Sequence, residues 1–165
     1  MDRDTLLVGL EFSRARLLGI LTAIGSSGQE AAKVLAWRPG PGRAHIAWQA
    51  MHCAATHDRY LHVALMGQSG PSDPAMVAAY GGGSTPSDEN VPSLADIQKS
   101  LTLHYDAFKA YIGTLQPADL DRVVGPPDRR RSIGESIVLM TWHEAHHQGQ
   151  IHLTWNMYKQ AYGVK

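Results

Sequence analysis

The sequence predicts an all-α protein, a four-helix bundle with a long crossover between its second and third helices. Three observations support this fold class. Four segments space their apolar residues at steps of three and four, as the buried stripe of an amphipathic helix does. No segment shows the alternation of a half-buried strand. Glycine, proline and polar residues separate the four segments. The length of 165 residues suffices for a sizeable core, so we expect one domain over residues 1–165.

The first predicted helix covers residues 4–24. A Gly-Ser-Ser-Gly run at residues 25–28 interrupts the pattern, and residues 30–37 are compatible with a short helical turn. The following run at residues 38–42, Arg-Pro-Gly-Pro-Gly, stops any continuation, because two prolines and two glycines cannot extend a helix. The apolar positions with helical spacing are Leu7, Leu10, Leu17, Leu18, Leu21 and Ile24.

The second predicted helix covers residues 44–66, with Gly67 as its C-cap. Residues 68–92 form a long connection that is too polar and glycine-rich to enter the core. Loops longer than about 15 residues are usually functional or mobile. We expect this one to carry the chain across the bundle, so that the third helix need not run antiparallel to the second.

The third and fourth helices both begin with a capping-box pattern. Ser93 is followed by Asp96, and Ser132 is followed by Glu135, three residues on in each case. The fourth helix is expected to extend to about residue 161 and to end at Gly163. In the third helix, which ends before Pro117, the apolar stripe consists of Leu94, Ile97, Leu101, Tyr105, Phe108, Ile112 and Leu115.

Composition excludes several function classes. Fifteen basic and fifteen acidic residues give a formal net charge of zero, so the chain lacks the basic excess of a general nucleic-acid binder. No stretch approaches the roughly 20 apolar residues that span a bilayer, and the acidic start at residues 1–4 is unlike a signal peptide. The single cysteine, Cys53, excludes an internal disulfide and a cysteine-rich zinc site. We expect a cytoplasmic protein without a nucleic-acid or membrane partner.

Four of the nine histidines lie in the short run at residues 142–152. His143 and His147 are four residues apart, so on a helix they lie one turn apart and can bind one metal ion. A projection at about 100° per residue places both on the rim of the buried face. The same projection places His146 toward solvent or an interface and His152 at the surface or rim.

A third ligand must come from another helix, and the second helix offers His45, His52 and His57. The helical projection mildly favours His57, but periodicity does not decide the choice. Glu144 points near the middle of the core face, where a carboxylate needs a partner. Either it orients a ligand histidine, or it pairs with a base on a neighbouring helix.

Two segments resemble motifs of the DinB/YfiT-like family of metalloenzymes. Residues 46–52, Ile-Ala-Trp-Gln-Ala-Met-His, are similar to the second-helix motif, and residues 143–151 are similar to the His-x-x-x-His motif of the fourth helix. The resemblance spans nearly the whole chain and implies a four-helix bundle with a divalent metal held by His52, His143 and His147. His57 then becomes a second choice or a residue behind the ligands. Gln148 departs from the family, where many relatives have arginine.

The resemblance also implies a function. Three imidazoles leave coordination positions open, as in catalytic rather than structural sites. Characterised relatives transfer thiols such as bacillithiol or mycothiol, or isomerise maleylpyruvate. We therefore expect a thiol S-transferase-like enzyme, or a hydrolase, acting on a small molecule with Zn or Ni, and with Mn or Fe as alternatives. The family also implies a homodimer. The alternative is a non-catalytic metal-binding helical protein that acts as a stress-associated interaction module.

Three other features have simpler expected roles. Cys53 is expected to be a small buried hydrophobe rather than a nucleophile. The arginine run at residues 129–131 is expected to be a solvated charge run, with an anion site as the alternative. Trp142 and Trp155 are expected to make core or dimer contacts.

Overall fold

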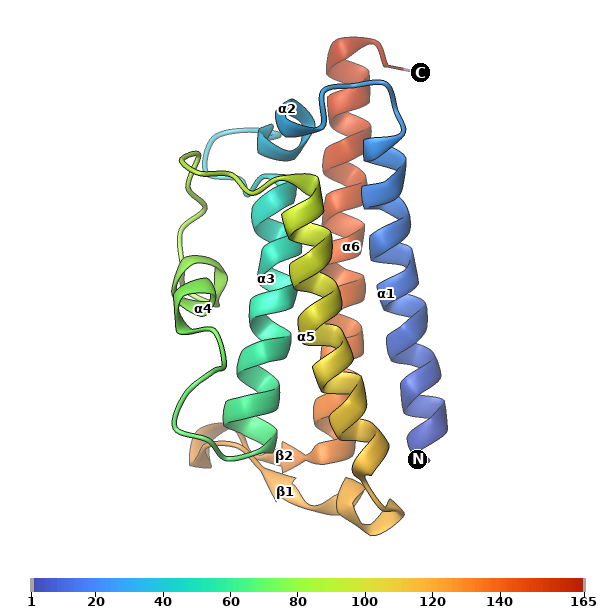
Figure 1. Cartoon of the computed structure of the whole chain (residues 1–165), viewed down its shortest axis with the longest axis vertical. Coiled ribbons are helices and arrows are strands. Elements are labelled where there is room, and N and C mark those ends of the chain that lie inside the picture. Colours follow the sequence, from blue (N-terminus) through green and yellow to red (C-terminus); the bar gives the residue numbers. More distant parts are fainter. Residues whose placement is uncertain (1, 165) are drawn as a thin grey trace.

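Four long helices build the molecule, and the computed structural model describes residues 2–164. Shorter elements occupy the connections between them (Figure 1). In chain order the elements are α1 (Arg3–Gly25), α2 (Ala31–Ala36), α3 (Ile46–Arg59), a π-helical segment (Tyr60–Leu65), α4 (Pro74–Tyr80), α5 (Leu94–Thr114), a 3-10 turn (Pro117–Asp121), β1 (Val123–Val124), a second 3-10 turn (Pro127–Arg129), β2 (Arg131–Ser132) and α6 (Ile133–Tyr162).

The long helices run in two directions. In Figure 1, α1 and α6 ascend while α3 and α5 descend, so the consecutive pair α3 and α5 is parallel. A parallel pair requires the chain to return along the full bundle, and the segment between these helices does this on the outer side of α3. The all-α bundle with its crossover between the second and third long helices is therefore confirmed.

The caps predicted for the last two long helices are present. The Ser132 hydroxyl accepts from the Glu135 amide at 3.1 Å, and the Glu135 carboxylate accepts from the Ser132 amide at 2.7 Å. Ser93 accepts from the amide of Asp96 at 3.2 Å. Gly163 ends α6 with φ of 63°, a left-handed conformation that glycine adopts without a Cβ penalty.

Three elements differ from the expectations. The second helix does not stay regular to residue 66, because its last turns widen into the π-helical segment. The crossover contains α4, which starts with an Asp73 cap and Pro74 in the first turn. Residues 123–124 and 131–132 form a two-stranded antiparallel ladder, pairing Val123 with Ser132 and Val124 with Arg131. Strands of two residues are too short for alternation to reveal them.

A polar layer divides the apolar core into two clusters. One cluster is built around Leu17, Ile97 and Ile151, and the other around Leu10, Phe108 and Ile137. Between them along each long helix lie buried polar side chains, which is an expensive arrangement unless each has a partner. These side chains are Ser13 and Arg14 on α1, His57 and Asp58 on α3, His104 on α5, and Glu144 and His147 on α6.

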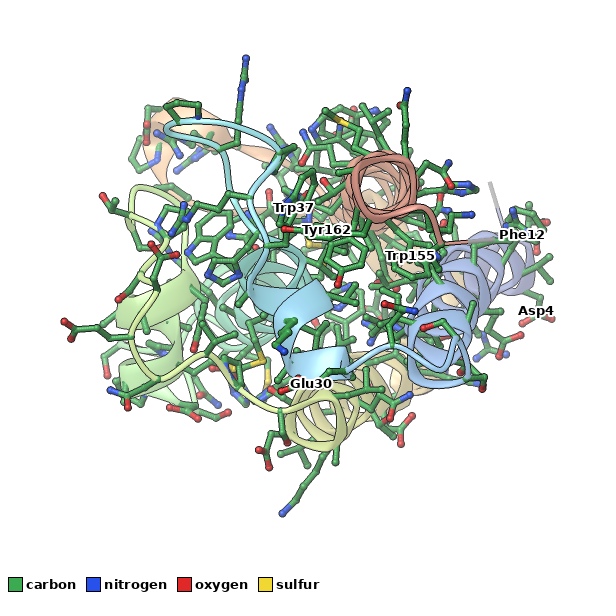
Figure 2. The ribbon with its side chains drawn as sticks, turned by 90° about the horizontal axis from the view of Figure 1, so that it is seen from above. Asp4, Phe12, Glu30, Trp37, Trp155 and Tyr162 are labelled. Atoms are coloured by element: carbon green, nitrogen blue, oxygen red, sulfur yellow. The ribbon has the colours of Figure 1, made fainter. Side chains whose placement is uncertain are left out.

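Aromatic side chains close the end of the bundle where α2 lies. The ring of Trp37 meets Tyr158 edge-on at 5.7 Å, and Trp155 stacks on the same tyrosine at 5.6 Å. Figure 2, viewed onto this end, shows Trp37, Trp155 and Tyr162 gathered near the axis while Phe12 lies at the periphery. Trp155 is thus a core residue, whereas Trp142 is 58 % exposed.

Within residues 2–164, none of the helices combines the length and apolar character needed to cross a bilayer.

Candidate metal centre

Three histidines from two helices meet at the middle of the bundle. His52 comes from α3, and His143 and His147 come from α6; one ring nitrogen of each lies within 4.8 Å of the others. Nε2 of His52 is 3.1 Å from Nε2 of His143. The helical spacing of four residues brings the two α6 rings to a centroid distance of 4.6 Å. The structure therefore brings together the three residues that the family motifs pointed to.

The orientation of His52 is set from two sides. Its Nδ1 is 2.6 Å from the backbone carbonyl of Tyr80, at the end of α4. A carbonyl can only accept, so Nδ1 carries the proton and Nε2 presents its lone pair toward His143. Trp48, one turn earlier on α3, stacks on the ring with 9° between the planes. The crossover thus fixes the tautomer of a histidine on the helix before it.

Burial keeps the three imidazoles neutral. It lowers the pKa of His143 to about 4 and that of His147 to about 3, and the neighbouring histidines add to both shifts. Burial also lowers the pKa of His52. Neutral imidazole is the form that binds a metal ion, so protons do not compete for these nitrogens near neutral pH.

The residues fit a divalent metal ion. Two nitrogens bound to one tetrahedral Zn at about 2.0–2.1 Å would lie roughly 3.3 Å apart, close to the observed distance of 3.1 Å between the two Nε2 atoms. His52 and His147 are each 9 % exposed, and Nδ1 of His147 has no hydrogen-bond partner within residues 2–164. Three neutral ring nitrogens that converge on one point cannot all hydrogen-bond to each other, whereas a cation can accept a lone pair from each of them.

His57 and Glu144 belong to a different cluster. Arg14 of α1 lies between them: its Nη2 is 3.1 Å from Nδ1 of His57 and donates to the Glu144 carboxylate at 3.0 Å. Burial lowers the pKa of His57 well below its usual value, and Arg14 adds to this, so the ring accepts the arginine proton. Burial raises the pKa of Glu144, and Arg14 opposes that shift.

These contacts bear on the alternatives left open for both residues. Glu144 pairs with a base on a neighbouring helix, and no hydrogen bond joins it to a ligand histidine in the described part of the chain. His57, which the projection mildly favoured, contacts Arg14 in the polar layer and is not one of the three grouped histidines, so its position fits the second expectation, a residue behind the ligands. Arg14 was missed, although it occupies the step between Leu10 and Leu17 in the apolar stripe of the first helix.

The remaining candidates lie outside the cluster. His146 is exposed and stacks on Trp142, and His152 is exposed, as the projection indicated. His45 caps α3 by accepting from the amide of Trp48 at 3.0 Å. Cys53 is 1 % exposed, and burial raises the pKa of its thiol, so it is packed as a hydrophobe.

A pocket of about 830 Å³ opens beside the histidine cluster. His52 and His143 form part of its wall, together with the π-helical segment, the glycines that follow α4, and the loop between β1 and β2. The cluster is therefore reachable by a small molecule, since this volume lies within the range of ligand pockets. Sequence reasoning missed the pocket because its wall comes from four separate stretches of the chain.

The fold and the histidine cluster define a helical bundle with a candidate metal centre. The sequence model of the DinB superfamily matches residues 10–151, and the chain belongs to this superfamily. No curated protein sequence matches the chain. Superfamily membership and the cluster together point to a divalent metal.

Proposed function

We propose that this protein is a metal-dependent enzyme with an open three-histidine site, most similar in chemistry to the thiol S-transferases. One observation carries the proposal: two histidines of the cluster, His52 and His143, also form the wall of a pocket large enough for a small molecule. A structural metal site is closed by four protein ligands, whereas this cluster offers three nitrogens beside an open space.

Zn or Ni suits the site best, and Mn or Fe is the alternative, because imidazole binds all four. When bound, the ion supplies a Lewis acid that acidifies water or holds a substrate thiol as thiolate. The chain supplies the rest: Tyr80 fixes the ring of His52, and the apolar lining of the pocket excludes water from part of the substrate. Cys53 takes no part, since its thiol is buried.

The pocket also favours an enzyme over the non-catalytic alternative. A stress-associated interaction module would need no cavity at its metal, and its fourth coordination position would be filled by the protein. The homodimer, the cytoplasmic location and the absence of a nucleic-acid partner stay predictions. Sedimentation of the purified protein tests the first of these.

Metal analysis of protein purified without a histidine tag tests the proposal. We expect about one divalent ion per chain in the wild type and its loss in His52→Ala, His143→Ala and His147→Ala. His57→Ala and His152→Ala are the controls: the first removes a buried histidine of the polar layer, the second an exposed histidine of the same helix as two ligands.

Two results would contradict the proposal. Metal that survives in all three ligand variants would place the ion elsewhere, and a wild type that takes up no metal on reconstitution would remove the site. If the ion is present, transfer of a low-molecular-weight thiol to an electrophilic acceptor is the first activity to assay, with the metal-depleted protein as the blank.

A further inference from the structure

Four arginines surround the end of the pocket that is farthest from the middle of the bundle. They come from four different places in the chain: the end of α3, the residue before β1, the 3-10 turn before β2, and β2 itself. No carboxylate side chain of the described residues lines the pocket. Although the formal net charge of the chain is zero, one wall of this pocket carries only positive side-chain charge. We call this the arginine wall; it consists of Arg59, Arg122, Arg129 and Arg131.

The charge of this wall is nearly uncompensated. Among residues 2–164, Arg59, Arg122 and Arg131 have no carboxylate within ion-pair distance, and Arg129 has only its neighbour Asp128 at 3.3 Å. That pair is about three-quarters exposed on both sides, where ion pairs contribute little. Only Arg131 is half-buried and the other three arginines are exposed, so solvent screens part of their mutual repulsion, and an anion bound between the guanidinium groups would remove it.

Neutral hydroxyl groups hold two of these guanidiniums in place. Arg131 donates to Oη of Tyr60 at 3.1 Å, and Arg122 donates to Oη of Tyr111 at 3.4 Å. A tyrosine hydroxyl positions an arginine without neutralising it. The backbone adds to this, because the amide of Ile133 donates to the carbonyl of Arg122 at 3.0 Å beside the short ladder.

The three members of the arginine run, residues 129–131, have different surroundings. Arg129 and Arg131 line the pocket, whereas Arg130 between them does not. Arg130 borders a second hollow on the outer face near Trp142, and Arg131 lies between the two and borders both. Arg129 ends the 3-10 turn, while Arg130 and Arg131 continue in extended backbone, where successive side chains leave on different sides. Arg129 and Arg130 are exposed, as expected of a solvated charge run, whereas Arg131 is half-buried; the anion-site alternative stays open for the two that line the pocket.

The arginine wall lies at a distance from the histidines. Arg59 follows His52 by seven positions on α3, a rise of roughly 10 Å along the helix axis. In Figure 1 the ladder that bears Arg131 lies below the end of α3 and at the start of α6. The wall between the two ends is apolar or small and includes Ala55, Val63 and Ser136.

We infer that this pocket binds an elongated organic anion, whose carboxylate or phosphate group pairs with the arginine wall while its other end reaches His52 and His143. Planar guanidinium forks match both groups through paired hydrogen bonds. Such an anion would be the substrate in the proposed function. Its pairing with the arginine wall does not depend on that proposal, whereas the placement of its other end at the histidines does.

Calorimetric titration of metal-stripped protein with succinate and with inorganic phosphate tests the arginine wall by itself. We expect saturable binding that weakens as salt is added, and a loss of roughly tenfold in affinity for both Arg59→Gln and Arg131→Gln. Arg130→Gln is the matched control, because it removes the same charge from the same run outside the pocket, and it should bind as the wild type does. Tighter binding of succinate points to a carboxylate ligand, and tighter binding of phosphate points to a phosphate ligand; both support the inference.

The inference is overturned if neither probe binds the wild type, or if Arg130→Gln weakens binding as much as the two wall variants. Arg131→Gln also removes a contact to Tyr60, so a thermal melting curve checks that this variant is folded. If Arg131→Gln proves unfolded, the test rests on Arg59→Gln, which loses no such contact. Metal-loaded protein tests whether the ligand is long enough to reach the histidines. The longer dicarboxylate sebacate should bind more tightly than succinate, and equal affinities would overturn the inference that the ligand is elongated. A protein without metal contradicts the proposed function but leaves the titration of the stripped protein unaffected.

Discussion

Arg14 and Glu144 form a buried ion pair between α1 and α6. Nε of Arg14 lies 2.7 Å from Oε1 of Glu144, and the two side chains are 5 % and 0 % exposed. Nη2 of the same arginine also reaches Nδ1 of His57 at 3.1 Å, so one guanidinium joins three helices across the polar layer. Breaking such a pair leaves a charge without a partner in the interior.

The first prediction concerns this pair. Arg14→Met should lower the free energy of unfolding by about 3–5 kcal/mol, because Glu144 remains buried without its cation. The double variant Arg14→Met/Glu144→Leu should cost clearly less than the single one, since neither charge is left. Urea unfolding of the wild type and the variants measures this. If the loss of unfolding free energy in the double variant equalled the sum of the losses in Arg14→Met and Glu144→Leu, the two side chains would not interact.

The second prediction concerns the carbonyl that orients His52. A Cβ on Gly81 would collide with the carbonyl oxygen of Val77, so Gly81→Ala must shift the end of α4 and with it the carbonyl of Tyr80. We expect metal affinity to fall about 10-fold or more although all three ligands remain. Gly82→Ala is the control, because a Cβ there meets nothing within 4 Å. Equal affinities of the two variants, measured by competition with a chelator, would rule out this role for Tyr80.

The third prediction concerns pH. His45 is buried, which lowers its pKa; Arg38 adds to that shift, and hydrogen bonding to Ser87 opposes it. Below the pKa of about 6.5 that His45 has in the unfolded chain, the unfolded chain therefore binds more protons than the folded one. The folded state loses stability as the pH falls from this value toward the lower pKa of His45 in the folded protein. We expect the free energy of unfolding to decrease between pH 7 and pH 5. His45→Asn, which keeps a capping side chain, should reduce this dependence. A variant with an unchanged slope would assign the effect to the other buried histidines.

The fourth prediction concerns Cys53. Because burial raises the pKa of its thiol and the side chain is 1 % exposed, a disulfide reagent should not label the folded protein. The same reagent should label one thiol per chain in guanidinium chloride. Rapid labelling under native conditions would mean that α3 opens at this position.

Local signals in the sequence predict the long helices well. Capping pairs such as Ser132 with Glu135 act over three residues, and apolar stripes act over single helices, so both are visible without a structure. The pair His143 and His147 is visible for the same reason. The sequence did not predict α4, because a helix of seven residues with Met76 as its single buried residue has no periodic apolar pattern.

The third ligand and the arginine wall depend on contacts between distant segments. A helical projection of α3 gives directions around one axis, but it does not show that Arg14 from α1 occupies the space beside His57. Family resemblance supplied His52 where periodicity did not. Arg59 and Arg122 belong to segments with no common pattern, and only the ladder at the end of the bundle brings them to one pocket.

His52 and His143 are separated by 91 positions in the chain yet face each other at 3.1 Å. A cation held between them would bind the assembled bundle and not the unfolded polypeptide, so binding and folding are linked by mass action. Above the dissociation constant, each tenfold rise in free metal adds about 1.4 kcal/mol to the apparent stability. The supply of metal would then govern how much of this protein resists unfolding and proteolysis, in addition to how much is active.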